Sequence, residues 1–239
     1  HIRTAYARKQ LLHAILGAKD WIASYRENLG QSIIFHGPVG GGKTTIAHNI
    51  LEQFREEFVP EDYPEGAFSI SRGKVLTATE LMHIMSGDVI GKDGKRQQGP
   101  VNLTGVLAGC NAVLIDDLGW EEIPYAGDQF NFKRQRRWSD FLEYVSTAAE
   151  KVTEYTNGKP QPKRLHLIIT TNYSLFIQSN GNMVPNPEVV KVLSPRGFSR
   201  LLELVGPYQY DFSAVPDYRA VKAAKRGRCC HGYTPQERA

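Results

Sequence analysis

The sequence has few cysteines, no long apolar run and no strong excess of charge of one sign. Its three cysteines, Cys110, Cys229 and Cys230, are too few and too poorly spaced for a disulfide framework or a zinc site. No apolar stretch approaches the span of a bilayer, and no secretory signal opens the chain. These absences predict a protein of the reducing cytoplasm, without a membrane partner.

Hydrophobic residues make up 41% and charged residues 23% of the 239 positions, as in an ordinary globular protein. This composition excludes a disordered chain and suffices for one sizeable core. The net charge of +4 is small, but basic residues gather in Lys92–Arg96, in Lys133–Arg137 and in a tail from Lys222 to Arg228. The first two clusters are solvated surface by default, and they are also candidate phosphate contacts to nucleic acid.

The strongest pattern is a glycine-rich stretch between a short apolar run, Ile33–Phe35, and a helix-like segment. Its spacing is that of a phosphate-binding loop, in which glycines let backbone N–H groups turn toward a triphosphate. Lys43 would contact the β- and γ-phosphates of ATP, and the Thr44 hydroxyl would reach the accompanying Mg²⁺. The predicted nucleotide-binding residues are Gly37, Pro38, Val39, Gly40, Gly41, Gly42, Lys43, Thr44 and Thr45.

Two further apolar runs end in polar side chains. Ala112–Ile115 leads into Asp116 and Asp117, and Leu165–Thr170 leads to Asn172. After a phosphate-binding loop, Asp116 is expected to hold the Mg²⁺ and Asp117 to orient or deprotonate the attacking water. If the two strands are neighbours, Asn172 would lie beside Asp116 and could hold the water or the γ-phosphate.

The remaining pattern predicts alternating strands and helices around a sheet of five mostly parallel strands, with helices on both faces. A capping box at Thr77–Glu80 predicts a helix start. The other two strands are Val75–Leu76 and Tyr208–Phe212, and helices are expected at Ala5–Leu29, Ile46–Phe54, Trp138–Val152, Phe198–Leu204 and from Asp217. Loops are expected at Gly87–Pro100 and Thr156–Lys163, and the segment Gln178–Pro187 is turn-rich.

The motifs resemble those of the AAA+ ATPases, in particular DnaC-type helicase loaders and IstB-type transposition helpers. The resemblance is carried, in order, by Gly37–Thr44, Leu114–Gly119, Ile168–Asn172, Ser199–Leu201 and Asp217–Arg219. It implies a three-layer P-loop NTPase fold with a reduced or absent helical lid. The expected division is a helical segment at 1–30, an ATPase core at 31–220 and a basic tail at 221–239.

Residue roles also follow from the resemblance. It makes Asn172 the first sensor, Arg219 the second sensor and Arg200 an arginine finger that completes a neighbouring subunit's site, with Arg196 as the competing finger. A finger supplied in trans implies a homo-oligomer. The family acts on nucleic acid, which strengthens the basic clusters as DNA contacts.

Several functions remain open at this stage. The first hypothesis is an ATPase that loads or remodels a replicative helicase on single-stranded DNA. The second is a transposition ATPase that acts on duplex DNA with a transposase. The third is an adaptor switched by ATP with little hydrolysis, since Asp117 reaches one methylene less far than the more common Glu. A small-molecule kinase is disfavoured because the polar strand ends suit attack by water.

Overall fold

The protein, studied as a computed structural model, is built around one parallel β-sheet. The structure describes residues 2–24, 31–57, 73–86, 88–90, 96–98, 107, 110, 112–119, 128–151, 153–156, 159–162 and 165–219. The sheet has the strand order β11-β1-β8-β5-β2, and all four pairings are parallel. Its strands are β1 (Ile33–His36), β2 (Gly73–Thr77), β5 (Ala112–Leu118), β8 (His166–Thr171) and β11 (Gln209–Asp211).

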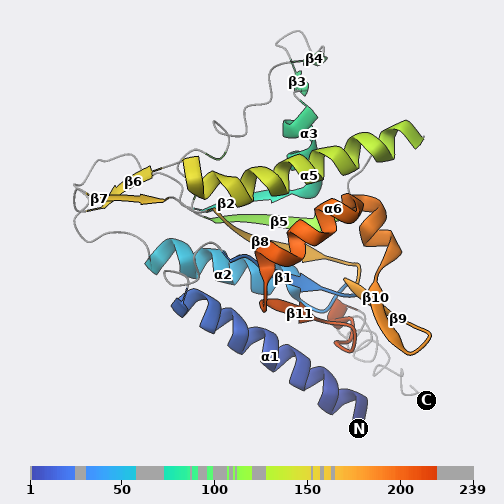
Figure 1. Ribbon diagram of the computed structural model, residues 1–239. Helices are drawn as coiled ribbons and strands as arrows, with labels where there is room; N and C mark the ends of the chain where they lie inside the picture. Colours follow the sequence, from blue (N-terminus) through green and yellow to red (C-terminus); the bar gives the residue numbers. More distant parts are fainter. Residues whose placement is uncertain are drawn as a thin grey trace, which may run out of the picture.

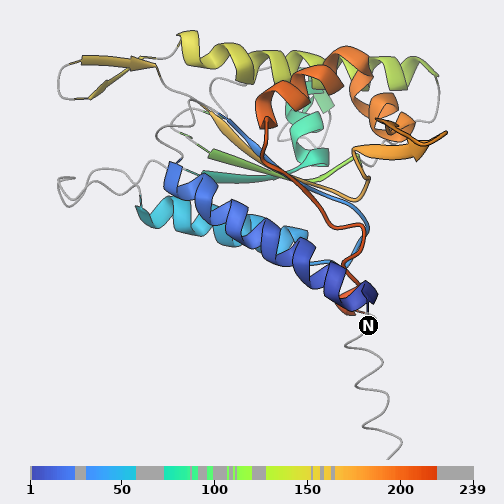
Figure 2. The same ribbon diagram turned by 60° about the horizontal axis from the view of Figure 1, so that its bottom comes forward.

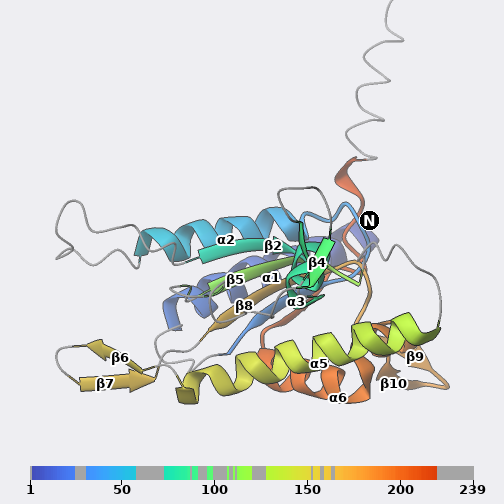
Figure 3. The ribbon, with the colours of Figure 1, turned by 90° about the horizontal axis from the view of Figure 1, so that it is seen from above.

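Helices cover both faces of this sheet and give three layers (Figures 1 and 2). The helix α1 (Ile2–Ser24) lies beside α2 (Lys43–Glu57) on one face. The other face carries α3 (Ala78–Ser86), α5 (Asp128–Lys151) and α6 (Pro187–Val205), and α5 packs along α6 (Figure 3). The α/β fold expected from the sequence is confirmed, and the sheet is wholly parallel where a mostly parallel one was predicted.

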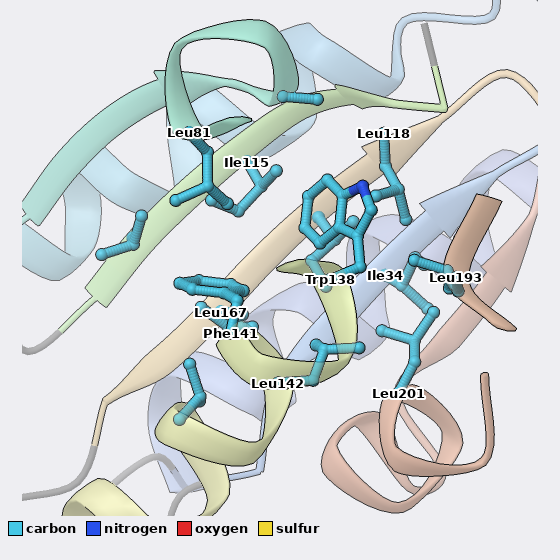
Figure 4. Packing of buried hydrophobic residues seen from close by; sticks show 14 of the residues in the cluster. Ile34, Leu81, Ile115, Leu118, Trp138, Phe141, Leu142, Leu167, Leu193 and Leu201 are labelled. Carbon is cyan, nitrogen blue, oxygen red and sulfur yellow. The ribbon is translucent and has the colours of Figure 1, made fainter. Parts of the chain in front are cut away.

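The three central strands β1, β5 and β8 are mostly apolar and buried because each face of the sheet is covered by a different core. Alternate residues of a strand point to opposite faces, so Ile33 and Phe35 join the core under α1 and α2, whereas Ile34 joins the other. That second core gathers Trp138 and Phe141 of α5 over Ile115 and neighbouring strand residues (Figure 4). The two cores hold the carboxyl ends of the strands in fixed register.

The predicted capping box forms where β2 passes into α3. The Glu80 carboxylate accepts hydrogen bonds from the Thr77 backbone N–H at 2.7 Å and from its hydroxyl at 3.0 Å, and the Thr77 hydroxyl accepts from the Glu80 N–H at 3.1 Å. The reciprocal bonds satisfy backbone groups that the first turn leaves free.

Two predicted loops contain paired strands, so those predictions were wrong, and the turn-rich segment forms most of a hairpin. Residues 87–100 contain β3 (Asp88–Ile90) paired with β4 (Arg96–Gln98), and residues 156–163 contain β7 (Lys159–Pro162), paired with β6 (Thr153–Thr156). Residues 178–187 contain most of the hairpin β9 (Phe176–Ser179) and β10 (Asn182–Pro185). Asn180 and Gly181 form its turn at φ 49° and 79°, the Asn-Gly signal typical of a two-residue hairpin.

The helix predicted from Phe198 begins earlier, at Pro187, and is bent. Asn186 caps it by accepting the Glu188 N–H at 3.0 Å, and Ser194 interrupts it with φ 67° directly before Pro195. Proline removes a helical N–H and excludes the preceding residue from helical angles, which explains the bend. None of the helices in the described parts of the chain is long and apolar enough to span a bilayer.

Candidate functional site

The predicted phosphate-binding loop joins β1 to α2, with α2 beginning at Lys43. Gly37, Gly40 and Gly42 have φ angles of 118°, 80° and 90°, which residues with a Cβ rarely adopt. The loop leads directly into the first turn of α2, and the backbone N–H groups of a helix's first turn are those that bind phosphate. Pro38, Val39 and Thr45 are exposed around it.

Lys43 is buried, and its ammonium group is held at two points. Its Nζ donates to the Pro38 carbonyl at 2.7 Å and to Asn172 Oδ1 at 3.0 Å. Desolvation lowers the pKa of Lys43, and the nearby charges of Asp117 and Asp116 oppose that shift. The first sensor predicted from the sequence therefore contacts the predicted phosphate-binding lysine directly.

Asp116 is fixed by two hydroxyl groups. Its Oδ1 accepts a hydrogen bond from Thr44 Oγ1 at 3.0 Å and another from Thr170 Oγ1 at 2.5 Å. Thr44 and Asp116 thus bring two oxygen ligands together beside the phosphate-binding loop, the ligand type that Mg²⁺ prefers. The described residues contain no group of three carboxylate, cysteine or histidine side chains that could hold a metal alone, and Mg²⁺ carried by a nucleotide needs none.

Asp117 is exposed and lies beside Asn172. Asn172 Nδ2 donates to Asp117 Oδ1 at 3.1 Å, so the same amide joins Lys43 to Asp117. Desolvation and the Asp116 charge raise the pKa of Asp117, against the Asn172 hydrogen bond and the charges of Lys43 and Arg219. A carboxylate with a raised pKa is a better proton acceptor at neutral pH than an ordinary aspartate.

A segment after β11, residues 212–219, lies against the outside of the phosphate-binding loop. The Phe212 N–H donates to the His36 carbonyl at 2.8 Å, and the Tyr218 N–H donates to the Gly40 carbonyl at 3.1 Å. A Cβ on Gly40 would overlap the Asp217 carboxylate. Arg219 is exposed, and its positive charge is a minor contribution that lowers the pKa of Lys43 and opposes the rise in the pKa of Asp117.

The two candidate finger arginines lie on α6, each paired with a glutamate. Arg200 Nη1 is 3.0 Å from Glu203 Oε2 and retains 36% of its side-chain exposure. Arg196 Nη2 is 2.6 Å from Glu143 Oε2 of α5. The structure joins Lys43, Thr44, Asp116, Asp117 and Asn172 by hydrogen bonds within one chain, whereas Arg200 bonds elsewhere. Its role in a neighbouring site stays a prediction.

The basic clusters are covered unequally. Several predicted features lie outside the described residues: Lys92, Lys95, the tail from Lys222 to Arg228, and Cys229 and Cys230. The prediction of a reduced or absent helical lid also concerns residues that the structure does not describe. Lys133 and Arg136 are exposed on α5, and Arg136 Nε makes only a long contact of 3.9 Å with Asp140.

The fold is similar to those of solved structures, including a helicase loader and a domain of a replication initiation protein. The crystal structure of the DnaC helicase loader matches with a TM-score of 0.48 and 18% sequence identity, over 84% of this chain and 89% of that chain. Domain III of the Thermotoga maritima replication initiation protein DnaA matches with a TM-score of 0.48 and 15% identity, over 94% of this chain and 71% of that one. At these identities the similarity describes the fold alone.

Sequence comparison adds no relative. No protein-family model matches the chain, and no curated protein matches its sequence.

The sequence interpretation missed two residues of the candidate site: Thr170, which bonds Asp116, and Asp217, which lies against Gly40 of the phosphate-binding loop. Thr170 was treated only as the end of a strand, although a threonine one position before a predicted strand tip is a possible signal. Asp217 was assigned only to a motif, and its packing against Gly40 depends on the path of the chain after β11.

Proposed function

We propose that this protein binds ATP with Mg²⁺ and hydrolyses it. The observation that carries the proposal is the network in which Lys43, Asn172 and Asp117 are linked at 3.0 and 3.1 Å, with Thr44 bonded to Asp116 at 3.0 Å. These groups gather at the carboxyl ends of three adjacent parallel strands, on β5, directly after β8 and at the start of the helix α2 that follows β1, where open α/β sheets bind ligands.

Each residue has a distinct task in this proposal. The backbone N–H groups of the loop and the Lys43 ammonium bind the phosphates, for which Lys43 exchanges its contact with Pro38. Thr44 and Asp116 would hold the Mg²⁺, which neutralises charge on the phosphate oxygens. Asp117 accepts the proton of the attacking water, and Asn172 orients that water or the γ-phosphate.

We further propose that hydrolysis changes an assembly of this chain on DNA and that the partner is a replicative helicase. The motif order and the Asp116–Gly119 sequence support this through their resemblance to DnaC-type loaders. The exposed Lys133 and Arg136 of α5 are available for phosphate contacts. Single-stranded DNA is the favoured ligand.

The decisive experiment measures ATP binding and turnover alone, with single-stranded DNA and with long duplex DNA. We expect Lys43→Ala to abolish turnover because neutralisation of the phosphates is lost. Lys19→Ala is the matched control, since Lys19 is an exposed lysine of α1. Full turnover by Lys43→Ala would contradict the site.

The DNA arms of this experiment separate the remaining functions. Stimulation by single strands supports the helicase-loader proposal, whereas a clear preference for long duplex would favour a transposition ATPase acting with a transposase. Tight ATP binding with negligible turnover in every arm would indicate a nucleotide-switched adaptor.

A further inference from the structure

The pairing between β5 and β8 is irregular at the two acidic residues. Ile115 is opposite Ile169 and Leu118 is opposite Thr171, so Asp116 and Asp117 together face the single residue Thr170. Two residues opposite one is the definition of a β-bulge, which leaves one residue out of the regular ladder and turns its side chain. Asp117, in this bulge, has a left-handed φ of 58°.

The Thr170 side chain takes over the hydrogen bonds that the bulge disturbs. Its Oγ1 accepts the Asp117 backbone N–H at 3.0 Å and donates to Asp116 Oδ1 at 2.5 Å. Thr170 is fully buried, so its hydroxyl is not accessible to bulk water. One hydroxyl therefore fixes the backbone of one acidic residue and the carboxylate of the other.

We propose that Thr170 is the positioning residue of this site, and that its hydroxyl holds Asp116 for Mg²⁺ and Asp117 for water. The inference rests on the proposed ATPase function. Without the hydroxyl, the Asp117 N–H loses this acceptor, and among the described residues Asp116 Oδ1 keeps only its bond from Thr44. The left-handed turn at Asp117 then loses the contact that opposes its strain.

Thr171 provides a matched control. It is the adjacent residue, also buried, and its Oγ1 donates to the Leu118 carbonyl at 2.7 Å and accepts the Tyr173 N–H at 3.3 Å. A hydroxyl-to-methyl exchange at Thr171 thus removes buried hydrogen bonds without touching either acidic side chain. Any general effect of losing a strand hydroxyl should appear in both variants.

The test compares Thr170→Val, Thr170→Ser and Thr171→Val with the parent protein. For Thr170→Val we expect the affinity for ATP without Mg²⁺ to be unchanged. The Mg²⁺ concentration for half-maximal turnover should rise, and kcat should fall, by about 10- to 100-fold each, the usual effect of removing a residue that hydrogen-bonds a metal ligand. Thr170→Ser retains the hydroxyl, so its Mg²⁺ requirement and its kcat should both be close to those of the parent. Thr171→Val should leave the Mg²⁺ requirement unchanged.

A second readout needs no turnover. In the nucleotide-free protein, hydrogen exchange of the Asp117 amide, followed by NMR, should be faster in Thr170→Val than in Thr170→Ser or the parent. Unchanged exchange and an unchanged Mg²⁺ requirement in Thr170→Val would overturn the role of Thr170 while leaving ATP hydrolysis intact.

A parent protein that binds ATP without turnover overturns hydrolysis alone, and the role of Thr170 is then tested by amide exchange and by the Mg²⁺ dependence of ATP binding. Absence of ATP binding by the parent would overturn both proposals.

Discussion

The backbone conformation and the environment of Asp117 both lower the stability of the fold. Its φ of 58° is uncommon for a residue with a Cβ, and desolvation with the Asp116 charge raises its pKa. A raised pKa means that the folded chain prefers the protonated form. Ionised Asp117 therefore destabilises the nucleotide-free fold, and the loss of stability begins above its ordinary pKa of 3.8 and is complete above the raised value.

This predicts that Asp117→Asn lowers turnover but raises the melting temperature at pH 7.5. Asparagine is neutral, can still accept the Asn172 hydrogen bond through its Oδ1, and tolerates left-handed angles better than most residues. Thermal unfolding of the two nucleotide-free proteins between pH 4 and 8 checks the prediction.

The stability difference should shrink as the pH falls toward 4, because the parent carboxyl then becomes neutral as well. A constant difference over the whole range would assign the effect to backbone conformation alone. Unaltered turnover would remove the assignment of Asp117 as the group that accepts the proton.

At the residue scale, the sequence predicted the acidic and amide groups because each follows an apolar strand. Asp116, Asp117 and Asn172 lie together as expected, since β5 and β8 are neighbours. The bulge was not predictable from the sequence, because an unbroken apolar run such as Ala112–Ile115 contains no information on register. The role of Thr170 depends on that register.

At the scale of elements, α1 approaches β11 most tightly at a glycine, Gly17, which faces Tyr210. A methyl group on Gly17 would overlap the hydroxyl and ring of Tyr210 in β11. Burial raises the pKa of Tyr210 to about 12, so the hydroxyl remains neutral at this contact. Nearby, Trp21 is fully buried and its Nε1 donates to the Gln31 carbonyl at 3.1 Å.

We therefore predict that Gly17→Ala destabilises the protein by about 1–3 kcal/mol, as overpacking of a tight contact does. The higher helix propensity of alanine, worth about 0.5–1 kcal/mol, should offset only part of this loss. Urea unfolding provides the measurement.

The sign should reverse in a Tyr210→Ala background, where the space is free and only the gain in helix propensity remains. Equal destabilisation by Gly17→Ala in both backgrounds would show that the contact with Tyr210 is not the cause.

Elements with a local signal were predicted better than elements set by long-range pairing. Thr77 and Glu80 predicted the start of α3, whereas β7 was taken for part of a loop and the strands of β9–β10 were not predicted within a turn-rich segment. Pro160 and Pro162 lie within β7, and proline argues against a strand unless it is at an edge. In β9–β10, Asn180-Gly181 was an available signal that outweighs the polar composition around it.

At the scale of the whole molecule, neither described arginine of α6 contacts the candidate ATP site of its own chain, because Arg196 pairs with Glu143 and Arg200 with Glu203. Arg200 is paired with Glu203, whose side chain is 66% exposed, so the ion pair is weak and easily exchanged. We predict that Arg200→Ala leaves ATP binding intact and lowers turnover by about 10³-fold or more, the effect of removing an arginine finger.

Mixing tests whether the finger acts between subunits. Lys43→Ala subunits carry an intact Arg200 and Arg200→Ala subunits an intact phosphate-binding loop, so a mixture should recover part of the turnover that neither has alone. Arg196→Ala is the control and should retain turnover on its own. If Arg196→Ala instead loses turnover and regains it when mixed with Lys43→Ala, Arg196 is the finger in place of Arg200. Loss of ATP binding by Arg200→Ala would instead indicate a role within its own subunit.

The position of β1 has a consequence for the order in which this protein is made and becomes active. β1 carries the phosphate-binding loop, and its two neighbours in the sheet, β8 and β11, both follow it by more than 120 residues in the sequence. On the ribosome, β1 therefore leaves the exit tunnel long before either strand that can pair with it, and the segment that contacts Gly40 is made later still. Nascent chains interrupted before β11 should be unable to hold ATP, so that incomplete copies cannot compete with finished ones for the nucleotide.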